Sequence, residues 1–314
     1  MKAIGITEYG GPEALELLDL PEPQAGDGEV RIRVHAAAVN PTDTLIRSGA
    51  RRQAGIAAPY VPGMDAAGII DQIGPGVDTR LAVGMPVVTI VVPSGTHGAY
   101  AEKIVVPAAS VVPAPRGADL VEASTLLMNA MTARLAVNAL ELSTGDVAAV
   151  TGAAGAFGGY AIQLAKADGL RVIADSKPED EALVTTFGAD EVIERGPDVA
   201  ARIRAVVPAG VPGLADGALL NGLAVPAIAD GGRLVTVREW DGPAERGIII
   251  HSVRVRHSAT DTQGLERLVR QVELGVLTLR VAQVFPATAA AQAHRLLEAG
   301  GIRGRLVLDF TDFG

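Results

Sequence analysis

A glycine cluster between an apolar run and a helix-like segment is the clearest chemical signal in the sequence. The stretch TGAAGAFGGYAIQLAK begins at Thr151 and follows the strand-like run DVAAV. A strand, a glycine turn and a helix in this order can hold the pyrophosphate of a dinucleotide, because the free N–H groups and the dipole of the helix start attract an anion. The alternative is that the glycines only shape a turn. The cofactor contacts expected here come from Gly152, Ala153, Gly155, Ala156, Phe157 and Gly158, of which Ala153, Gly155 and Gly158 stand at the three fingerprint positions.

The end of the next apolar run, RVIAD, bears on which nicotinamide cofactor is bound. Asp175 can accept hydrogen bonds from the hydroxyls of a plain ribose, whereas Ser176 and Lys177 can bind a 2′-phosphate. Periodicity does not say which of these side chains points into the site, and Lys177 could equally be a solvated loop lysine. The residues themselves therefore leave NADPH and NADH open.

These residues need a scaffold of alternating strands and helices, and the pattern of apolar runs and turn residues along the chain indicates one. With 314 residues, about two domains are expected. From residue 1 to about residue 115 the apolar runs are short, β-branched and bounded by Gly and Pro, which is typical of an all-β region. The pattern DLVE at Asp119 then predicts the start of a long helical stretch through residue 142. Beyond it the runs DVAAV, RVIAD, DEVIE, GALLN and GRLVTV predict strands of a parallel sheet built from βαβ units, and RLVLDF predicts a closing strand.

Composition narrows the class of function. A net charge of −9 without clustered Lys or Arg argues against binding to nucleic acid or to an anionic membrane surface, so a small-molecule substrate is expected. The absence of cysteine excludes disulfides, thiol chemistry and cysteine-ligated zinc. The five histidines are scattered without ligand spacing, which favours packing or surface roles. The start of the chain lacks the apolar core of a signal peptide, so we expect a cytoplasmic protein.

Four motifs, in this order and spacing, resemble the medium-chain dehydrogenase/reductase superfamily, specifically its zinc-independent quinone oxidoreductase branch, which is zeta-crystallin-like. They are AAVNPTDTLIRSG from Ala37, VPGMDAAGIIDQIGPGV from Val61, GTHGAYAE from Gly95 and the glycine stretch from Thr151. The resemblance covers nearly the whole chain. It implies an α/β protein with a GroES-like β domain plus a Rossmann doubly wound parallel-sheet domain, an active site between them, and a homodimer formed through the cofactor domains. The expected ranges are residues 1–120 for the GroES-like catalytic domain, 121–260 for the NAD(P)-binding domain and 261–314 for a return to the first domain.

The resemblance also makes several absences informative. Zinc-dependent relatives carry a cysteine where this chain has Asn40 and a His-Glu pair where it has Met64-Asp65, and their structural zinc needs four cysteines. A metal-free member is therefore expected. Without a Lewis acid, a quinone or enone is the favoured acceptor, because conjugation spreads the charge that hydride addition creates. By its place in the motif, Asn40 is expected to face the nicotinamide and to donate to the developing oxyanion, although it could also be an ordinary turn residue before Pro41.

The remaining expected cofactor contacts also come from the resemblance. Thr132 matches a family threonine near the nicotinamide, Arg305 matches a basic residue near the active site, and Arg195 stands where relatives may place an adenine-contacting residue. Thr132 could instead bond its own helical turn, and Arg305 could be a surface cation. Together, Ser176, Lys177 and Arg195 favour NADPH, with NADH possible.

Three departures from the family pattern limit this prediction. Leu45 and Arg51 stand where many quinone reductases have tyrosines, which leaves the acceptor open. Glu179 stands where some relatives carry a basic residue, which weakens the argument for NADPH. Two other classes therefore stay open: a reductase of enoyl thioesters or biosynthetic enones, and a non-catalytic nucleotide-binding or sensor protein.

Overall fold

The computed structural model describes residues 1–243 and 245–313, so Ala244 and Gly314 lie outside the described residues. Those two positions fall within the second and third of the predicted domain ranges. The chain divides into two compact units. Unit 1 contains residues 1–128, 256–274 and 279 onward, and unit 2 contains residues 129–255 and 275–278.

Unit 2 is built on a six-stranded parallel sheet. Its strands along the chain are β8 (Val147–Thr151), β9 (Arg171–Ser176), β10 (Glu191–Glu194), β11 (Val211–Asp216), β12 (Ile228–Thr236) and β13 (Ile249–Ser252). In space their order is β10-β9-β8-β11-β12-β13, and every neighbouring pair is parallel. Numbered from β8, this is the order 3-2-1-4-5-6 of a doubly wound dinucleotide-binding sheet, which reverses between β8 and β11. The predicted doubly wound parallel sheet is confirmed.

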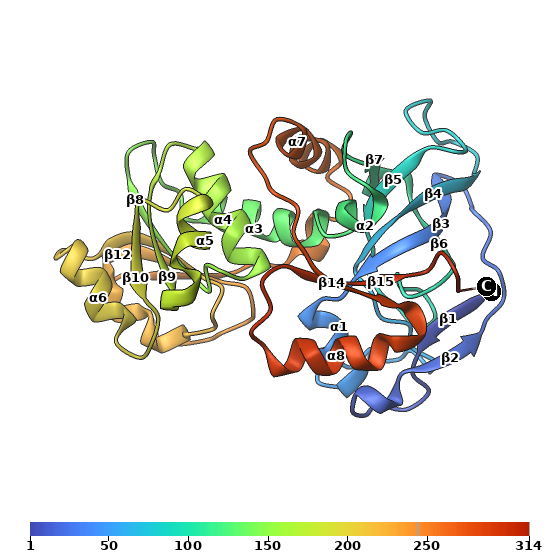
Figure 1. Ribbon diagram of the computed structural model, residues 1–314, viewed down its shortest axis with the longest axis horizontal. Coiled ribbons are helices and arrows are strands. Elements are labelled where there is room, and N and C mark those ends of the chain that lie inside the picture. Colours follow the sequence, from blue (N-terminus) through green and yellow to red (C-terminus); the bar gives the residue numbers. More distant parts are fainter. Residues whose placement is uncertain (244, 314) are drawn as a thin grey trace. The chain divides into compact units, whose positions relative to one another are not determined.

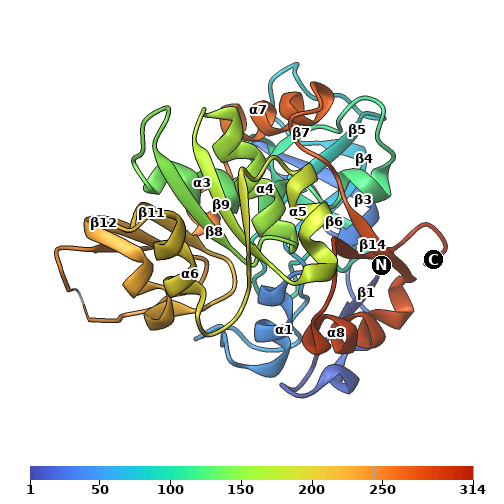
Figure 2. The ribbon, with the colours of Figure 1, turned by 60° about the vertical axis from the view of Figure 1, so that its left-hand side comes forward.

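Helices of unit 2 cover this sheet because their apolar residues face it. Helix α4 (Ala156–Ala167) packs on β8 and β9, while α5 (Glu181–Thr186) and α6 (Val199–Val206) pack near β10 (Figure 2). Ile162 and Leu164 of α4 are fully buried. The strand, turn and helix predicted around the glycine cluster are therefore all present, with α4 beginning directly after Gly155.

The turn between β8 and α4 brings backbone against backbone. Gly152 has a φ of +68°, and a Cβ there would lie 2.9 Å from the carbonyl carbon of Gly217. A Cβ on Gly158 would lie 2.3 Å from the Gly152 carbonyl oxygen and 2.6 Å from the Ala153 Cα. Only glycine fits at these two positions, because real Cβ atoms do not approach so closely. The first turn of α4 is thereby pressed directly onto the loop.

One predicted strand is wrong. The run GALLN, residues 217–221, forms a bend and the start of a 3-10 turn, and the strand is instead the preceding β11. The buried carboxylate of Asp216 accepts hydrogen bonds from the Ala218 N–H at 3.2 Å and the Asn221 N–H at 2.7 Å. These bonds curl the chain at the end of the strand, and Leu219 and Asn221 have positive φ values of 59° and 52°.

Unit 1 contains a largely antiparallel sheet and a short hairpin. The strands of the large sheet are β3 (Glu29–Ala38), β4 (Asp65–Ile73), β5 (Pro86–Ile90), β6 (Lys103–Pro107), β7 (Val111–Pro113), β14 (Val281–Pro286) and β15 (Arg305–Asp309). Their order is β14-β15-β3-β4-β5-β7, with β6 paired to β3, and only β14 and β15 are parallel. The hairpin joins β1 (Lys2–Gly5) and β2 (Glu16–Asp19). Residues far apart in the chain thus share one core, because β15 pairs with β3.

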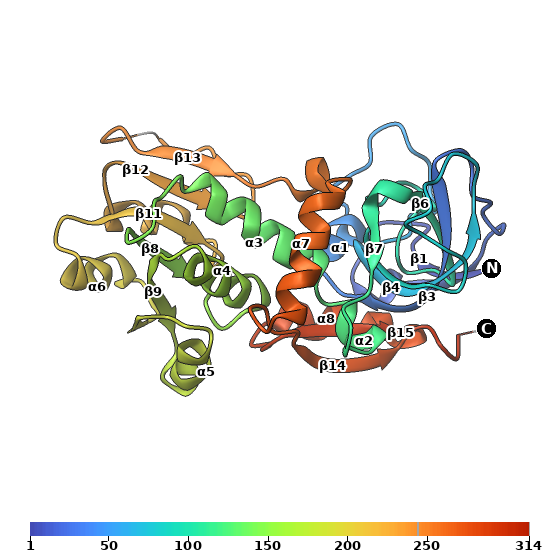
Figure 3. The same cartoon turned by 90° about the horizontal axis from the view of Figure 1, so that it is seen from above.

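Helices of unit 1 lie at the ends and edges of its sheet. Helix α1 (Pro41–Ser48) follows β3, and α8 (Ala290–Ala299) packs against β14 and β15 (Figure 1). Helix α7 (Thr262–Glu273) lies beside β7 (Figure 3). Leu265, Leu268 and Val269 form its buried stripe.

The long helix predicted from Asp119 is two helices, α2 (Leu120–Ala123) and α3 (Leu127–Ala139). The predicted N-cap is confirmed, because the Asp119 side chain accepts the Glu122 N–H. The break follows from hydroxyls that bond backbone carbonyls: Ser124 donates to Val121 at 2.7 Å and Thr125 donates to Glu122 at 2.7 Å. Such bonds compete with the helical ladder.

We expect Gly158→Ala to destabilise the protein by about 1–3 kcal/mol, because the new methyl group overlaps the Gly152 carbonyl in a packed site. Gly222→Ala is the matched control, since a Cβ there meets only Trp240 at 3.7 Å, an ordinary contact. Its effect should stay within about 0.5 kcal/mol. Urea unfolding of both variants measures the difference, and equal stabilities would contradict the close contact.

Candidate active site

The glycine loop and the start of α4 form the part of the site that suits an anion. Gly155 is the N-cap of α4, with a φ of −72°, and no side chain caps the helix. The backbone N–H groups of the first turn therefore have no capping side chain, which is the feature that a phosphate complements. Since unit 2 also brings Gly152 and Gly217 into close contact at the sheet reversal, the residues present fit a dinucleotide pyrophosphate.

Asp175 lies at the end of β9 and faces the glycine loop. Its side chain is buried, and Oδ1 accepts the Ala153 N–H at 3.2 Å. Burial raises the pKa of Asp175, while the loop N–H groups of Ala153 and Gly152 and the charge of Arg195 oppose that rise. The structure thus brings Asp175 and the loop together. A carboxylate has further acceptor capacity, so Asp175 can still accept from a ribose hydroxyl.

The residues expected around a 2′-phosphate gather near the same strand end. The Ser176 hydroxyl donates to the Lys177 carbonyl at 3.0 Å. The Lys177 ammonium lies 3.5 Å from Glu179 Oε1, and both side chains are exposed. Arg195 is exposed at the end of β10, and its backbone N–H donates to the Ser176 carbonyl at 2.8 Å. The Lys177 ammonium is therefore paired with an acidic neighbour, Glu179, in this structure.

Asn40 lies in unit 1, at the cap of α1, and it is fully buried. Its amide Nδ2 donates to Asp65 Oδ2 at 3.0 Å and to the Ala38 carbonyl at 3.2 Å. An Asn side chain has two amide hydrogens, so both are committed in this arrangement. Donation to an oxyanion, the role expected of Asn40, would require one of these two bonds to break. That role stays a prediction.

Asp65 joins three segments of unit 1. Its Oδ1 accepts the Met128 N–H at 2.8 Å, near the start of α3, and Oδ2 accepts the Asn40 amide. Arg305 Nη2 lies 4.0 Å from Oδ2, and Asp65 and Arg305 are only 1% and 5% exposed. Burial raises the pKa of Asp65 to about 6, while Arg305, Asn40 and the Met128 N–H act in the opposite direction.

A second buried acid, Asp43, lies beside Asn40. It accepts the Asn40 N–H at 2.7 Å, the Gly63 N–H at 3.0 Å and the Tyr100 hydroxyl at 3.2 Å. Burial raises the pKa of Asp43 to about 7, while the Asn40 and Gly63 N–H groups and the charge of Arg305 act in the opposite direction. The Tyr100 oxygen is also 3.1 Å from His294 Nε2. Burial lowers the pKa of His294 to about 3, and the charge of Arg47 adds to that effect.

The predicted residues thus occur in two groups. Those of unit 2 are the glycine loop, the end of β9, Arg195 and Thr132, which is in α3 and only 9% exposed. Asn40 and Arg305 are in unit 1. Sequence reasoning missed Asp43 and Tyr100, treated His294 only as a packing or surface residue, and treated Asp65 only as a residue that stands where zinc-dependent relatives have a metal ligand. A capping pattern, Asn40 followed by Asp43 three positions later in NPTD, could have indicated Asp43.

In residues 1–243 and 245–313, no group of three or more His, Cys, Asp or Glu side chains could hold a metal ion. Within the same part of the chain, no helix is long and apolar enough to cross a membrane. The expectation of a metal-free protein stays a prediction.

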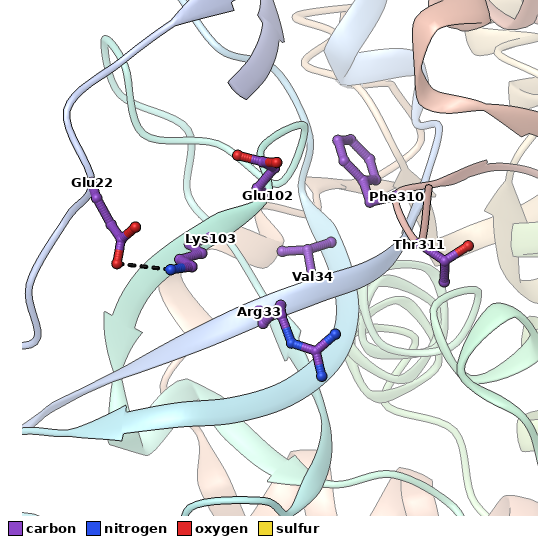
Figure 4. A pocket seen from close by; sticks show the side chains of 7 residues that line it. All are labelled: Glu22, Arg33, Val34, Glu102, Lys103, Phe310 and Thr311. Atoms are coloured by element: carbon purple, nitrogen blue, oxygen red, sulfur yellow. Dashed lines mark ion pairs between the residues drawn. The ribbon is translucent and has the colours of Figure 1, made fainter. Parts of the chain in front are cut away.

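A pocket of about 270 Å³ lies elsewhere on unit 1 (Figure 4). Its lining consists of Glu22, Arg33, Val34, Glu102, Lys103, Phe310 and Thr311. Most of its polar groups bind one another or nearby groups: Lys103 pairs with Glu22 at 2.7 Å, Glu102 accepts the Lys2 N–H, and Thr311 donates to Asp309. It contains none of the predicted site residues.

Comparison with known proteins covers nearly the whole chain. Residues 26–116 match the family model described as alcohol dehydrogenase GroES-like domain, which confirms the predicted β domain, and residues 187–308 match the model described as zinc-binding dehydrogenase. The quinone oxidoreductase of Sus scrofa is 32% identical over 98% of this chain and 97% of its own length. The quinone oxidoreductase of Pseudomonas aeruginosa is 31% identical over 98% and 99%.

Similar proteins of known structure include one described as NAD-dependent and one complexed with NADPH. An NAD-dependent alcohol dehydrogenase has a TM-score of 0.87 and 32% identity, with 98% of this chain and 99% of that chain covered. A mycobacterial protein complexed with NADPH has a TM-score of 0.87 and 28% identity, with 98% and 100% covered. Because these two proteins differ in their cofactor, the cofactor preference of this chain must be inferred from its own residues.

We expect His294→Gln to change how stability depends on pH. Between about pH 3 and pH 6.5 the unfolded chain binds a proton at His294 that the folded chain does not, so acid favours unfolding of the wild type. From pH 7.5 to 4.5 the wild type should lose stability relative to the variant, with a limiting slope of about 1.4 kcal/mol per pH unit. Urea unfolding at several pH values measures this.

Asp43→Asn provides the opposite sign. Between pH 3.8 and about 7 the folded chain binds a proton at Asp43 that the unfolded chain has lost, so acid favours the folded wild type. The wild type should therefore gain stability relative to this variant as the pH falls through that window. Curves that run parallel to the wild type for both variants would show that neither group is perturbed.

Proposed function

Because the chain belongs to the medium-chain dehydrogenase/reductase superfamily, in the group that contains the quinone oxidoreductases, we propose that it is an NADPH-dependent oxidoreductase that reduces a conjugated carbonyl, with a quinone as the acceptor. The observation that carries the proposal is the glycine loop at the reversal of a 3-2-1-4-5-6 parallel sheet, in a chain similar to quinone oxidoreductases over its full length. That loop supports dinucleotide binding, and the similarity supports the class of acceptor.

The proposed cofactor ligands are backbone groups of the loop and side chains at the strand ends. The N–H groups at the start of α4 would hold the pyrophosphate, and Ser176, Lys177 and Arg195 would surround the 2′-phosphate. Thr132 and Arg305 complete the proposed set. When bound, the nicotinamide supplies the hydride. What this chain adds is orientation of the two reactants, which alone can lower a barrier by several kcal/mol.

The proposed reaction needs no metal, and the side chains support that choice. Thiolate ligands are excluded because the chain has no cysteine. Asn40 and Met64 stand where zinc-dependent relatives have metal ligands, and the Asn40 amide donates to Asp65. A quinone or enone suits such a site, because its conjugation distributes the developing charge and requires less stabilisation at a single oxygen.

We expect the purified protein to oxidise NADPH in the presence of quinones, and to retain this activity after dialysis against a chelator. A panel of quinones, alkenals and enoyl thioesters at fixed NADPH, followed by absorbance, tests the acceptor class. Faster turnover of an enoyl thioester than of any quinone would replace the proposed acceptor. No turnover of any acceptor would favour a nucleotide-binding or sensor protein.

We expect Lys177→Ala to weaken NADPH binding about tenfold or more, because a charge-assisted hydrogen bond to phosphate contributes about 1.5–3 kcal/mol. NADH binding should hardly change. Glu179→Ala is the matched control, and its expected effect is the opposite one. It removes the partner of Lys177 in a surface ion pair that contributes at most about 1 kcal/mol, so NADPH should bind up to about fivefold more tightly. Titration calorimetry with both cofactors measures the four affinities. Equal losses for NADPH and NADH in the lysine variant would remove Lys177 from the phosphate site.

A further inference from the structure

The cluster around Asn40 holds two buried carboxylates and one buried cation that makes no hydrogen bond with the carboxylates. Asp43 and Asp65 are both fully buried, and Arg305 is 5% exposed. Within the described residues, Arg305 Nε and Nη2 have no hydrogen-bond partner, and the 4.0 Å separation from Asp65 is too long for a hydrogen bond. Arg305 therefore acts on Asp65 through charge. An opposite charge at this range in a buried site is strong enough to change which protonation state exists.

The orientation of the Asn40 amide depends on Asp65. Its two hydrogens point at two acceptors, the Asp65 carboxylate and the Ala38 carbonyl. Turning the amide by half a turn would place its oxygen against both acceptors, which is unfavourable in a buried site. A proton on Asp65 would weaken this orientation, because a neutral carboxyl group accepts a hydrogen bond less strongly than a carboxylate does. The ionised carboxylate is the state that fits.

From this geometry we propose that Asp65 is the positioning residue of the site: its ionised carboxylate orients the Asn40 amide and the start of α3, and Arg305 is the counter-ion that keeps it ionised. The role rests on the proposed function, since the reaction is what a displaced Asn40 would impair. Asp65 accepts one of the two amide hydrogens of Asn40, so the donation to an oxyanion that is expected of Asn40 would compete with this hydrogen bond.

The other groups that face Asp65 determine which controls are needed. Asn40 and the Met128 N–H donate to it, and Arg305 supplies positive charge. Asp43 and Tyr100 belong to the same electrostatic cluster, and the charges of Asp65 and Arg305 also act on both of them. A pH effect of removing Arg305 could therefore arise at Asp43 instead, so the test must separate the two acids.

The first test is the pH profile of NADPH oxidation with a quinone, for the wild type and for Arg305→Met, Arg305→Lys and Arg33→Met. Removing an opposite charge shifts a carboxyl pKa by about 1–3 units, so the acid limb of kcat/KM should move about one pH unit or more upward in Arg305→Met. It should move little in Arg305→Lys, which keeps the charge. Arg33→Met is the matched control, because Arg33 is an exposed arginine of the same sheet, on β3, at the pocket of Figure 4 and outside the cluster around Asn40.

A second variant separates positioning from folding. Asp65→Asn should lower kcat about tenfold or more while the dissociation constant of NADPH changes less than about threefold, because every proposed cofactor ligand except Arg305 lies in unit 2 and is untouched. An equal loss of cofactor binding would show a merely structural role and overturn the proposal. So would an acid limb in Arg305→Met that coincides with that of Arg33→Met.

A readout that needs no turnover distinguishes failure of this proposal from failure of the proposed function. If the wild type reduces no acceptor, the proposed function fails, but the ion pair can still be measured by urea unfolding. Arg305→Met should then cost more stability at pH 8 than at pH 5, because only at the higher pH is the carboxylate ionised without a counter-ion. In an Asp65→Asn background this pH dependence should disappear. A loss that is equal at both pH values, or one that persists in that background, overturns the assignment to Asp65.

Discussion

The contact between the first turn of α4 and the loop after β8 is the constraint on which unit 2 depends. A Cβ at Gly158 would overlap the Gly152 carbonyl, so the helix can lie this close to the loop only because residue 158 is glycine. This approach brings the uncapped N–H groups of α4 to the end of β8, beside β11, where the sheet reverses. An anion there meets backbone donors that need no side chain to orient them. The same contact therefore determines the packing of unit 2 and the geometry of the proposed cofactor site.

The polar cluster of unit 1 depends on buried charged side chains rather than on close backbone contacts. Removing two carboxylates from water is unfavourable, and Arg305 can compensate only part of that cost, since it lies 4.0 Å from Asp65 and makes no hydrogen bond to it. The two carboxylates also accept hydrogen bonds from Asn40, Gly63, Tyr100 and the Met128 N–H, which further stabilise them in the protein interior. Apolar residues of similar size could pack this region at less cost. What they could not do is orient an amide, which is the argument for a functional cluster rather than a purely structural one.

The sequence predicted the parts of the molecule that depend on local pattern. The glycine turn, the helix after it and the parallel strands follow from spacing within a few residues, and these predictions are confirmed. The strand GALLN was wrong because the Asp216 carboxylate, a single side chain, curls apolar residues that have strand-like composition. The role of Asp65 could not be predicted, because its partners come from α1, the start of α3 and β15. No local pattern brings such residues together.

The hydrogen bonds of Asn40 bear on the kind of substrate that unit 1 can serve. With both amide hydrogens committed to Asp65 and Ala38, Asn40 offers an oriented polar group rather than an uncommitted hydrogen-bond donor. An isolated ketone would concentrate the charge of hydride addition on one oxygen and would need a metal or a strong donor there. A quinone distributes that charge over the ring, so positioning contributes most of what the reaction requires. The commitment of Asn40 to Asp65 therefore supports the proposal that the acceptor is conjugated.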